Sequence, residues 1–469
     1  MEQHIPGIVL KDGLTQPVFD YKRCLFEKVY VETPVDTDGD GRLDLIAVYI
    51  RRPLETTQGM RVPAIYVANP YMLECNEDWY VPHDVDRDVS PYPQQHITES
   101  DITFDPSTVS FPQPRYPRAT VGYADTAPTE EIPLDCISDW YSYFNSRGYA
   151  SVFCGGLGTR GSQGFNCCGS PEETAAFKAV IDWLNGRCRA FTNLTDNIEI
   201  RADWCTGKVA MSGKSYLGTM CIAVASTGVE GLETIIPEAA ISNWYDYYRC
   251  NGLNLPAIGW QGDDLDILAK YCFSRAKDPE DYASVREAYA AWLEGIAADE
   301  DRDSGNYSRW WDMRNYLKAA DRFKASVFLV HGLADWNVKP THCVNLFAAM
   351  ECRGIPCKMM LHQGGHIYIH DLQGSRFNEM LHLWLDHWLY GIENGAAERI
   401  PNVLVQSNLD QDLWLASPSF PAVKGYTEPV LMPAQESGRL VDDLSATVYD
   451  RTRDNAAEWL AELVLSERH

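Results

Sequence analysis

The sequence of 469 residues has little positive charge, no long apolar run and no paired-cysteine motif. Its 66 acidic side chains outnumber its 40 lysine and arginine side chains, so the net charge is −26. This charge argues against nucleic acids and anionic membrane surfaces as partners, and it suits cationic or small neutral molecules. No apolar stretch is long enough to span a membrane. The first residues have neither the basic start nor the apolar core of a signal peptide.

The 14 cysteines are scattered, and most of them lie among apolar residues. Without C-x-x-C spacing they predict neither a disulfide framework nor a set of zinc ligands. We therefore expect reduced core cysteines and a cytoplasmic location. The chemistry predicted below requires no cofactor.

Residues 26–50 are expected to form a β-hairpin around the turn Asp36-Thr-Asp-Gly-Asp-Gly41. The spacing of Asp36, Asp38 and Asp40 resembles the start of a calcium loop. An EF-hand loop, however, needs an acid at its twelfth position, where Ala47 stands. The sequence alone therefore favours a solvated turn over a metal site.

Apolar runs alternate with amphipathic helical patterns along much of the chain. The runs predict strands at 62–68, 149–155, 232–237, 325–332 and 356–362, and the amphipathic patterns predict helices at 172–188 and 378–390. Parallel strands that alternate with helices indicate an α/β protein with a doubly wound sheet.

The stretch Gly207–Gly218 carries the most informative motif. Val209–Met211 reads as the end of a strand, Ser215 follows Gly213 by two residues, and a buried helix is expected over 219–226. Strand, tight turn with serine, and helix together predict a nucleophile elbow. The usual pattern is G-x-S-x-G, whereas here Leu217 takes the last place and the glycine comes one residue later. The motif alone leaves an ordinary turn serine equally open.

The order of elements downstream decides between these two interpretations. Asp335 follows strand 325–332, and His366 follows strand 356–362. In an α/β hydrolase the triad occurs in the chain order serine, acid, histidine, at the carboxyl ends of the strands. Alone, Asp335 could cap the helix after Pro340, and His366 could be a loop residue. Together they predict Ser215 as nucleophile, His366 as general base and acid, and Asp335 as the group that orients it.

An oxyanion hole needs two donors. The backbone N–H of Tyr216 is one, and the hydroxyl of Tyr71, in the loop after strand 62–68, is a candidate for the other. The alternative for Tyr71 is a core position under that loop.

The α/β-hydrolase domain is expected to be interrupted twice. It comprises 1–240, with an insertion at about 80–135, and continues over 325–400. Residues 241–324, rich in Trp, Tyr, Asp and Ala, predict a mainly helical cap between the two parts.

Four segments resemble the Xaa-Pro dipeptidyl-peptidases, serine exopeptidases related to cocaine esterase and the α-amino-acid ester hydrolases. They are Gly158-Thr-Arg-Gly161, Gly213-Lys-Ser-Tyr-Leu-Gly-Thr219, Trp244-Tyr-Asp-Tyr-Tyr-Arg-Cys-Asn-Gly252 and His331-Gly-Leu-Ala-Asp-Trp-Asn-Val-Lys339. The resemblance covers roughly residues 26–465. It implies the same triad and the same oxyanion hole, with proline-containing peptides as substrates.

The resemblance also implies a substrate site. Trp244 and Tyr247 are expected to wall a proline pocket, and Asn337 to hydrogen-bond the dipeptide near its free end. Asp263 stands where the family usually carries a glutamate that receives the substrate's α-ammonium, and Asp264 is the other candidate. An exopeptidase needs such an acid to recognise a free amine.

Members of this family also have a C-terminal β-sandwich, and some have a helical N-terminal domain. We expect 401–469 to be an extension toward a missing sandwich, and we expect an apolar surface there that favours homo-oligomers. The predicted function is removal of Xaa-Pro dipeptides. The alternatives are an esterase or acylase that acts on amino-acid esters, and a catalytically weakened fragment.

Overall fold

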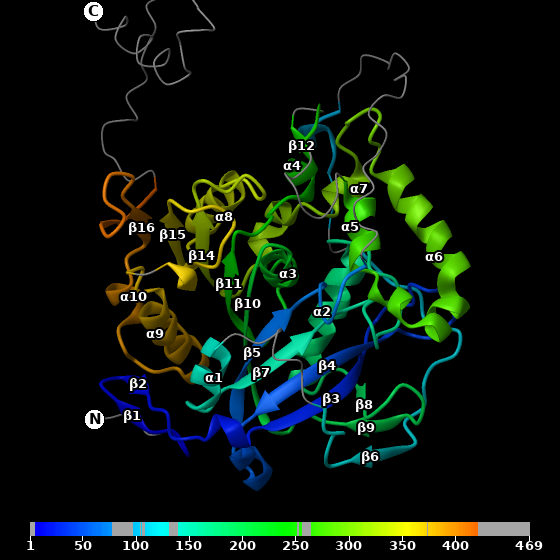
Figure 1. Cartoon of the computed structure of the whole chain (residues 1–469), viewed down its shortest axis with the longest axis horizontal. Helices are drawn as coiled ribbons and strands as arrows, with labels where there is room; N and C mark the ends of the chain where they lie inside the picture. Colours follow the sequence, from blue (N-terminus) through cyan, green and yellow to red (C-terminus); the bar gives the residue numbers. More distant parts are fainter. Residues whose placement is uncertain are drawn as a thin grey trace, which may run out of the picture. The chain divides into compact units, whose positions relative to one another are not determined.

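A mixed sheet of 13 strands runs through the described part of the chain (Figure 1). The computed structural model describes residues 5–76, 97–103, 105, 108–130, 139–250, 253–255, 264–372 and 374–420. All of them belong to one compact unit, Met1–Ala422. The second unit, Val423–His469, lies outside the described residues, as do residues 80–96, 104, 106, 107 and 131–135 of the predicted insertion at 80–135.

The order of strands across the sheet is β17-β16-β15-β14-β11-β10-β5-β7-β4-β3-β8-β9-β6. These strands are β3 (Leu25–Glu32), β4 (Leu45–Arg52), β5 (Val62–Ala68), β6 (Gly122–Ala124), β7 (Ala150–Cys154), β8 (Ala190–Phe191), β9 (Ile198–Ile200), β10 (Cys205–Lys214), β11 (Leu232–Glu238), β14 (Ser326–Gly332), β15 (Cys357–His362), β16 (Val403–Gln406) and β17 (Trp414–Ser417). Two small pairs, β1 (Leu10–Lys11) with β2 (Leu14–Thr15) and β12 (Arg249–Cys250) with β13 (Leu253–Asn254), lie apart from it.

The strands from β7 to β15 are parallel, and β4 runs antiparallel to β7 and β3. When the eight central strands are numbered in chain order, their order across the sheet from β3 to β15 is 1-2-4-3-5-6-7-8. This is the predicted α/β-hydrolase sheet, and the hairpin of β3 and β4 is the one expected at 26–50. Parallel strands place their carboxyl ends at one edge, which is where loops converge.

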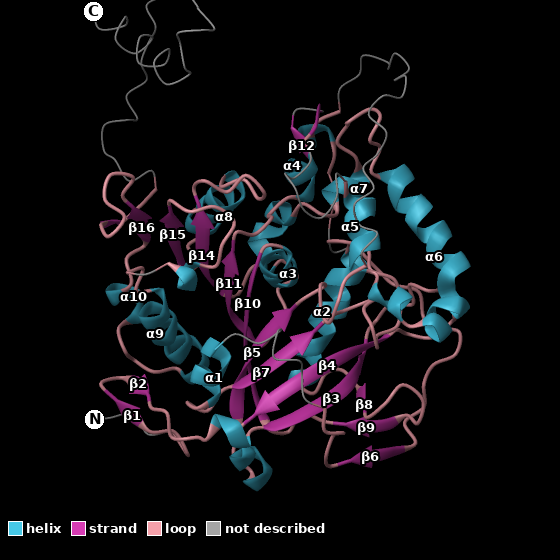
Figure 2. Cartoon of the chain, viewed as in Figure 1, coloured by secondary structure: helices cyan, strands magenta, loops and turns pink. Residues whose placement is uncertain are grey.

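Helices cover both faces of the sheet (Figure 2). Helices α2 (Pro171–Leu184), α3 (Tyr216–Ala225) and α8 (Thr341–Glu351) pack on one face, and α1 (Asp139–Asn145) and α9 (Phe377–Tyr390) pack on the other. The split follows the pleat, since Ile46 and Val48 join the first cluster while Ala47 and Tyr49 join the second.

Helix α2 shows how the sequence sets a boundary. Ser170 is its N-cap and accepts hydrogen bonds from the amides of Glu172 and Glu173, and Pro171 occupies the first turn. Phe177, Val180, Ile181 and Leu184 are all buried, as their spacing predicted.

Helices also dominate the region expected to form the cap. The described elements there are α4 (Trp244–Tyr248), α5 (Leu265–Cys272), η7 (Ser274–Lys277), α6 (Pro279–Asp299), α7 (Arg309–Asp312) and η8 (Tyr316–Arg322). The remaining short helices are η1 (Tyr21–Arg23), η2 (Leu54–Gln58), η4 (Glu99–Asp101), η9 (Ile369–Asp371) and α10 (Ala396–Arg399).

The sequence suggested that the α/β-hydrolase domain ends at residue 400. In the structure the chain continues the sheet beyond this residue. Strand β16 pairs in parallel with β15, and β17 pairs antiparallel with β16. Two short strands thus continue the sheet, because the free edge of β15 offers unpaired backbone groups. Within the part of the chain that is described, no helix is long and apolar enough to cross a membrane, and the 12 cysteines with described side chains are free thiols.

Candidate active site

Ser215 lies in a strained turn between β10 and α3. Its backbone has φ 62° and ψ −128°, a region that non-glycine residues rarely adopt. A side chain on Gly213 would collide with Cβ of Leu217 at 2.4 Å, and one on Gly218 would collide with the carbonyl oxygen of Gly213 at 2.6 Å. The turn therefore needs glycine at 213 and 218, which explains the displaced glycine of the motif.

Asp335 and His366 meet at the same edge of the sheet as Ser215. Nδ1 of His366 lies 2.7 Å from Oδ2 of Asp335. Oδ1 of Asp335 accepts hydrogen bonds from the amides of Asn337 and Val338, both at 2.9 Å. Because a carboxylate only accepts, Nδ1 carries the proton, and Nε2 of His366 is the ring nitrogen able to accept another.

A second histidine lies near the acid. His331 is buried, its Nε2 lies 2.7 Å from the carbonyl of Val338, and its pKa is lowered chiefly by burial. Because His331 is neutral, it does not compensate the negative charge of Asp335, which is available to stabilise a protonated His366.

The two residues predicted to supply the oxyanion donors pack against each other. The rings of Tyr71 and Tyr216 meet edge to face with centroids 5.7 Å apart. The amide of Tyr216 is the first of α3, so it has no partner within that helix. Burial raises the pKa of Tyr71 well above its usual range, so its phenol keeps the proton that it would donate.

The predicted proline-pocket residues pack around this pair. Tyr247 donates its hydroxyl to Oδ1 of Asn337 at 2.7 Å, which orients the amide of Asn337. Trp244 has no exposed surface, and its ring lies 5.1 Å from Tyr216 and 6.0 Å from Tyr247 between centroids. In this structure the buried ring of Trp244 packs against Tyr216 and Tyr247.

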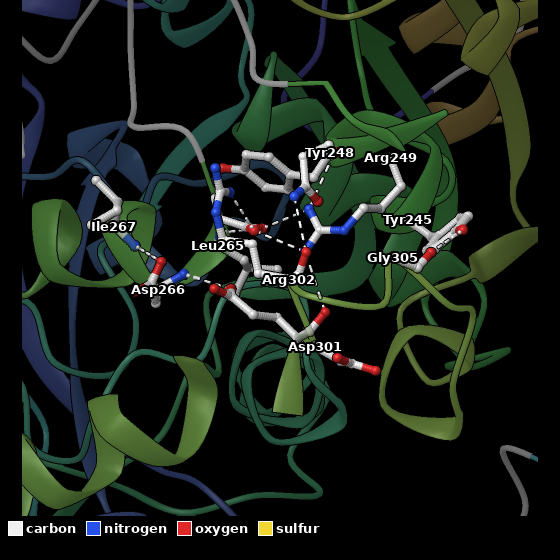
Figure 3. A network of polar contacts seen from close by, with 12 residues as sticks. Tyr245, Tyr248, Arg249, Leu265, Asp266, Ile267, Asp301, Arg302 and Gly305 are labelled. Atoms are coloured by element: carbon white, nitrogen blue, oxygen red, sulfur yellow. Dashed lines mark hydrogen bonds and ion pairs between the residues drawn. The ribbon is translucent and has the colours of Figure 1, made fainter. Parts of the chain in front are cut away.

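Of the two acids proposed for the substrate amine, Asp264 is engaged elsewhere. Its fully buried carboxylate pairs with Arg249 at 2.8 Å and with Arg302 at 2.8 Å, and it accepts from the amide of Leu265 (Figure 3). Two guanidinium groups neutralise its charge, so Asp264 is poorly suited to bind an ammonium group. Asp263 lies outside the described residues.

Two residues that sequence reasoning missed, Lys214 and Glu238, contact the loop that carries His366. Nζ of Lys214 donates to the carbonyl of His366 at 3.2 Å and lies 4.9 Å from the ring centre of Tyr368. Glu238, at the end of β11, accepts from the amide of Ile369 at 2.9 Å, and burial raises its pKa to about 7. The position of Lys214 beside the serine was the only available signal.

A buried acid, Glu173, also contacts the residue that follows the nucleophile. The hydroxyl of Tyr216 donates to both oxygens of Glu173, at 2.8 and 2.9 Å, and the amide of Gly169 donates to the same carboxylate. Burial raises the pKa of Glu173 to about 7. No local pattern in the sequence pointed to this contact.

Comparison with known proteins identifies a family for this chain. The profile of the X-Pro dipeptidyl-peptidases (S15 family) matches residues 38–368, more than half of the chain. The chain belongs to this family. The match includes Ser215, Asp335 and His366 of the triad predicted above.

Individual S15 relatives are longer. The Xaa-Pro dipeptidyl-peptidase of Pediococcus pentosaceus is 40% identical over 469 aligned residues, which cover 97% of this chain and 57% of the relative. That of Lacticaseibacillus casei is 43% identical and covers 91% of this chain and 53% of the relative. This S15 chain therefore spans somewhat more than half the length of the curated relatives that it matches.

Solved structures of other hydrolases are more distant. An α-amino acid ester hydrolase has 18% identity and a TM-score of 0.49, over 84% of this chain and 59% of its own. A CocE/NonD family hydrolase from Staphylococcus aureus has 14% identity and a TM-score of 0.49, over 87% of this chain and 63% of its own.

Proposed function

We propose that the chain is a serine exopeptidase that releases Xaa-Pro dipeptides from peptide N-termini through an acyl-enzyme. The observation that carries the proposal is the joint placement of a strained Ser215 and the His366–Asp335 pair at one sheet edge, in a chain of the S15 family.

In the proposed reaction His366 removes the proton of Ser215 as Oγ of Ser215 attacks the carbonyl carbon of the proline. The Tyr216 amide and the Tyr71 hydroxyl stabilise the oxyanion, and the protonated histidine then donates to the leaving amine. Water, activated by His366, hydrolyses the ester and restores Ser215. Asp335 keeps the imidazole oriented throughout.

The specificity proposal rests on the aromatic residues beside the elbow. Tyr247, backed by Trp244, forms a wall for the proline ring, and the oriented amide of Asn337 bonds the dipeptide near its amine. Because Asp264 is already paired with two arginines, we assign the α-ammonium to Asp263.

The deciding experiment compares Ala-Pro-p-nitroanilide, its N-acetylated form and a short-chain ester. We expect fast release from the free-amine substrate only, labelling of Ser215 by a fluorophosphonate, and no turnover by Ser215→Ala. Labelling of another serine would contradict the assignment. Loss of the anchoring acid in Asp263→Asn should weaken free-amine substrates by about 2–5 kcal/mol, with Asp203→Asn as an exposed control.

An esterase or acylase of amino-acid esters is the second candidate, favoured by the engagement of Asp264 in ion pairs. Equal rates on free and N-acetylated substrates would support it. A chain with weakened catalysis is the third candidate, and feeble turnover of every substrate would support it. We also propose self-association, which light scattering can test, and a cytoplasmic location, which cell fractionation can test.

A further inference from the structure

The turn that joins β3 to β4 gathers three carboxylates that the proposed reaction does not use. One oxygen each of Asp36, Asp38 and Asp40 lies within 4.8 Å of the others. The amides of Gly39 and Gly41 donate to Asp36 at 2.9 Å, and Gly41 has φ 86°, the kind of sharp turn found at the sixth place of calcium loops.

A cluster of exposed acids would mean little, but Asp38 is not exposed. Its side chain is only 7% accessible. Oδ2 pairs with Nη1 of Arg275 at 2.9 Å and accepts from the amide of Gly164. Oδ1 is buried and has no hydrogen-bond partner. A buried carboxylate oxygen without a donor is costly, and a bound cation removes that cost.

The net charge around the turn is negative, which favours binding of a cation. Asp44, also buried, accepts from the amide and hydroxyl of Thr37, and burial raises its pKa to about 8, so it adds little negative charge at pH 7. The guanidinium of Arg275 is shared with Asp281 at 2.7 Å, and that of Arg118 also interacts with Asp40. The three carboxylates of the turn therefore carry more negative charge than these two guanidinium groups neutralise.

We propose that Asp36, Asp38 and Asp40 bind a Ca²⁺ ion in the β3–β4 turn, with water completing its oxygen coordination. The sequence favoured a solvated turn because Ala47 replaces the bidentate acid of an EF-hand. The structure changes this interpretation, because the side chain of Asp38 is buried and its Oδ1 has no hydrogen-bond partner. In a solvated turn, water would bind that oxygen. With no bidentate acid, we expect a dissociation constant of about 10⁻⁵ to 10⁻³ M.

The ion would brace a junction of three segments. The amide of Phe165 donates to Thr37 beside the turn, and Arg275, in η7, donates its amide to the carbonyl of Gly158. The site thus joins the turn to the loop after β7 and to η7. We expect Ca²⁺ to stabilise the fold without taking part in the reaction.

The test uses the full chain after treatment with a chelator. Tb³⁺ should bind with luminescence excited through aromatic residues, for which Tyr116, whose amide donates to the carbonyl of Gly41, is a nearby donor. Ca²⁺ should displace Tb³⁺, and millimolar Ca²⁺ should raise the melting temperature by a few degrees. Asp38→Asn and the milder Asp40→Asn should each weaken binding at least tenfold, whereas the exposed control Asp203→Asn should not.

Asp40→Asn guards against misfolding, because the carboxylate of Asp40 is exposed and accepts a hydrogen bond from the nearby amide of Arg42. No Tb³⁺ signal and no thermal shift at 10 mM Ca²⁺ would overturn the proposal. So would binding that both variants leave unchanged, because the ion would then lie elsewhere. Equal affinity for Mg²⁺ would overturn the assignment to calcium.

Discussion

Glu300 is a buried acid whose protonation can be tested by a single substitution. It follows α6 directly, its Oε2 accepts from the amide of Asp266 at 3.2 Å, and its Oε1 has no hydrogen-bond partner. Burial, and then the charges of Asp264 and Asp266, raise its pKa to about 10. Glu300 is therefore protonated at pH 7, and Glu300→Gln keeps its shape without a titrating proton.

The size of the effect follows from proton linkage. An unfolded glutamate has a pKa of about 4.3, so at pH 7 the chain must take up a proton as it folds. At 1.36 kcal/mol per pH unit this costs up to about 4 kcal/mol. Glutamine avoids the cost but must place its N–H₂ in the same site, so we expect Glu300→Gln to stabilise the fold by about 2 kcal/mol at pH 7.

The sign of the pH dependence is a second check. Because the folded pKa of Glu300 lies above the unfolded one, the native state binds more protons, and stability falls as the pH rises from about 4.5 toward 10. The advantage of Glu300→Gln should therefore be small at pH 5 and larger at pH 8.

Urea denaturation at pH 5, 7 and 8, followed by tryptophan fluorescence, measures both effects. Glu294→Gln, at an exposed position of α6, is the matched control and should change the free energy of unfolding by less than about 0.5 kcal/mol. A loss of about 3 kcal/mol or more in Glu300→Gln would refute the reasoning, because it would mean that Glu300 is ionised and paired with Arg249.

Three further predictions concern the candidate active site. Asp335→Asn should lower kcat on Ala-Pro-p-nitroanilide by about 10⁴-fold with little change in KM, because His366 loses its orienting acceptor; a loss under tenfold would exclude this role. Tyr71→Phe should lower kcat by about 10²- to 10³-fold in steady-state assays if its hydroxyl is an oxyanion donor; unchanged kcat would place Tyr71 in a packing role. Tyr216→Phe should destabilise the fold by about 1–3 kcal/mol at pH 8, where Glu173 is ionised, and by less at pH 6 in urea denaturation; equal losses at both pH values would contradict the titration of Glu173.

The sequence by itself determined the class of the fold and the chain order of the candidate triad. Strand periodicity located β10, β14 and β15, and strands of a parallel sheet end at one edge, so residues that directly follow them are brought together. Ser215, Asp335 and His366 could therefore be proposed without coordinates. Their chemical roles stay predictions until they are tested by substitution.

Only the tertiary structure decided contacts that depend on how distant segments pass one another. No local sequence pattern indicates three of these contacts. They are the ion pairs of Asp264 with Arg249 and Arg302, the hydrogen bond from Tyr216 to Glu173, and the buried oxygen of Asp38. Local periodicity reports which face of an element is apolar, whereas burial of a charge depends on the segments that cover it. For that reason the sequence could propose Asp264 as an amine-binding acid, but only the folded chain could show that two guanidinium groups already occupy it.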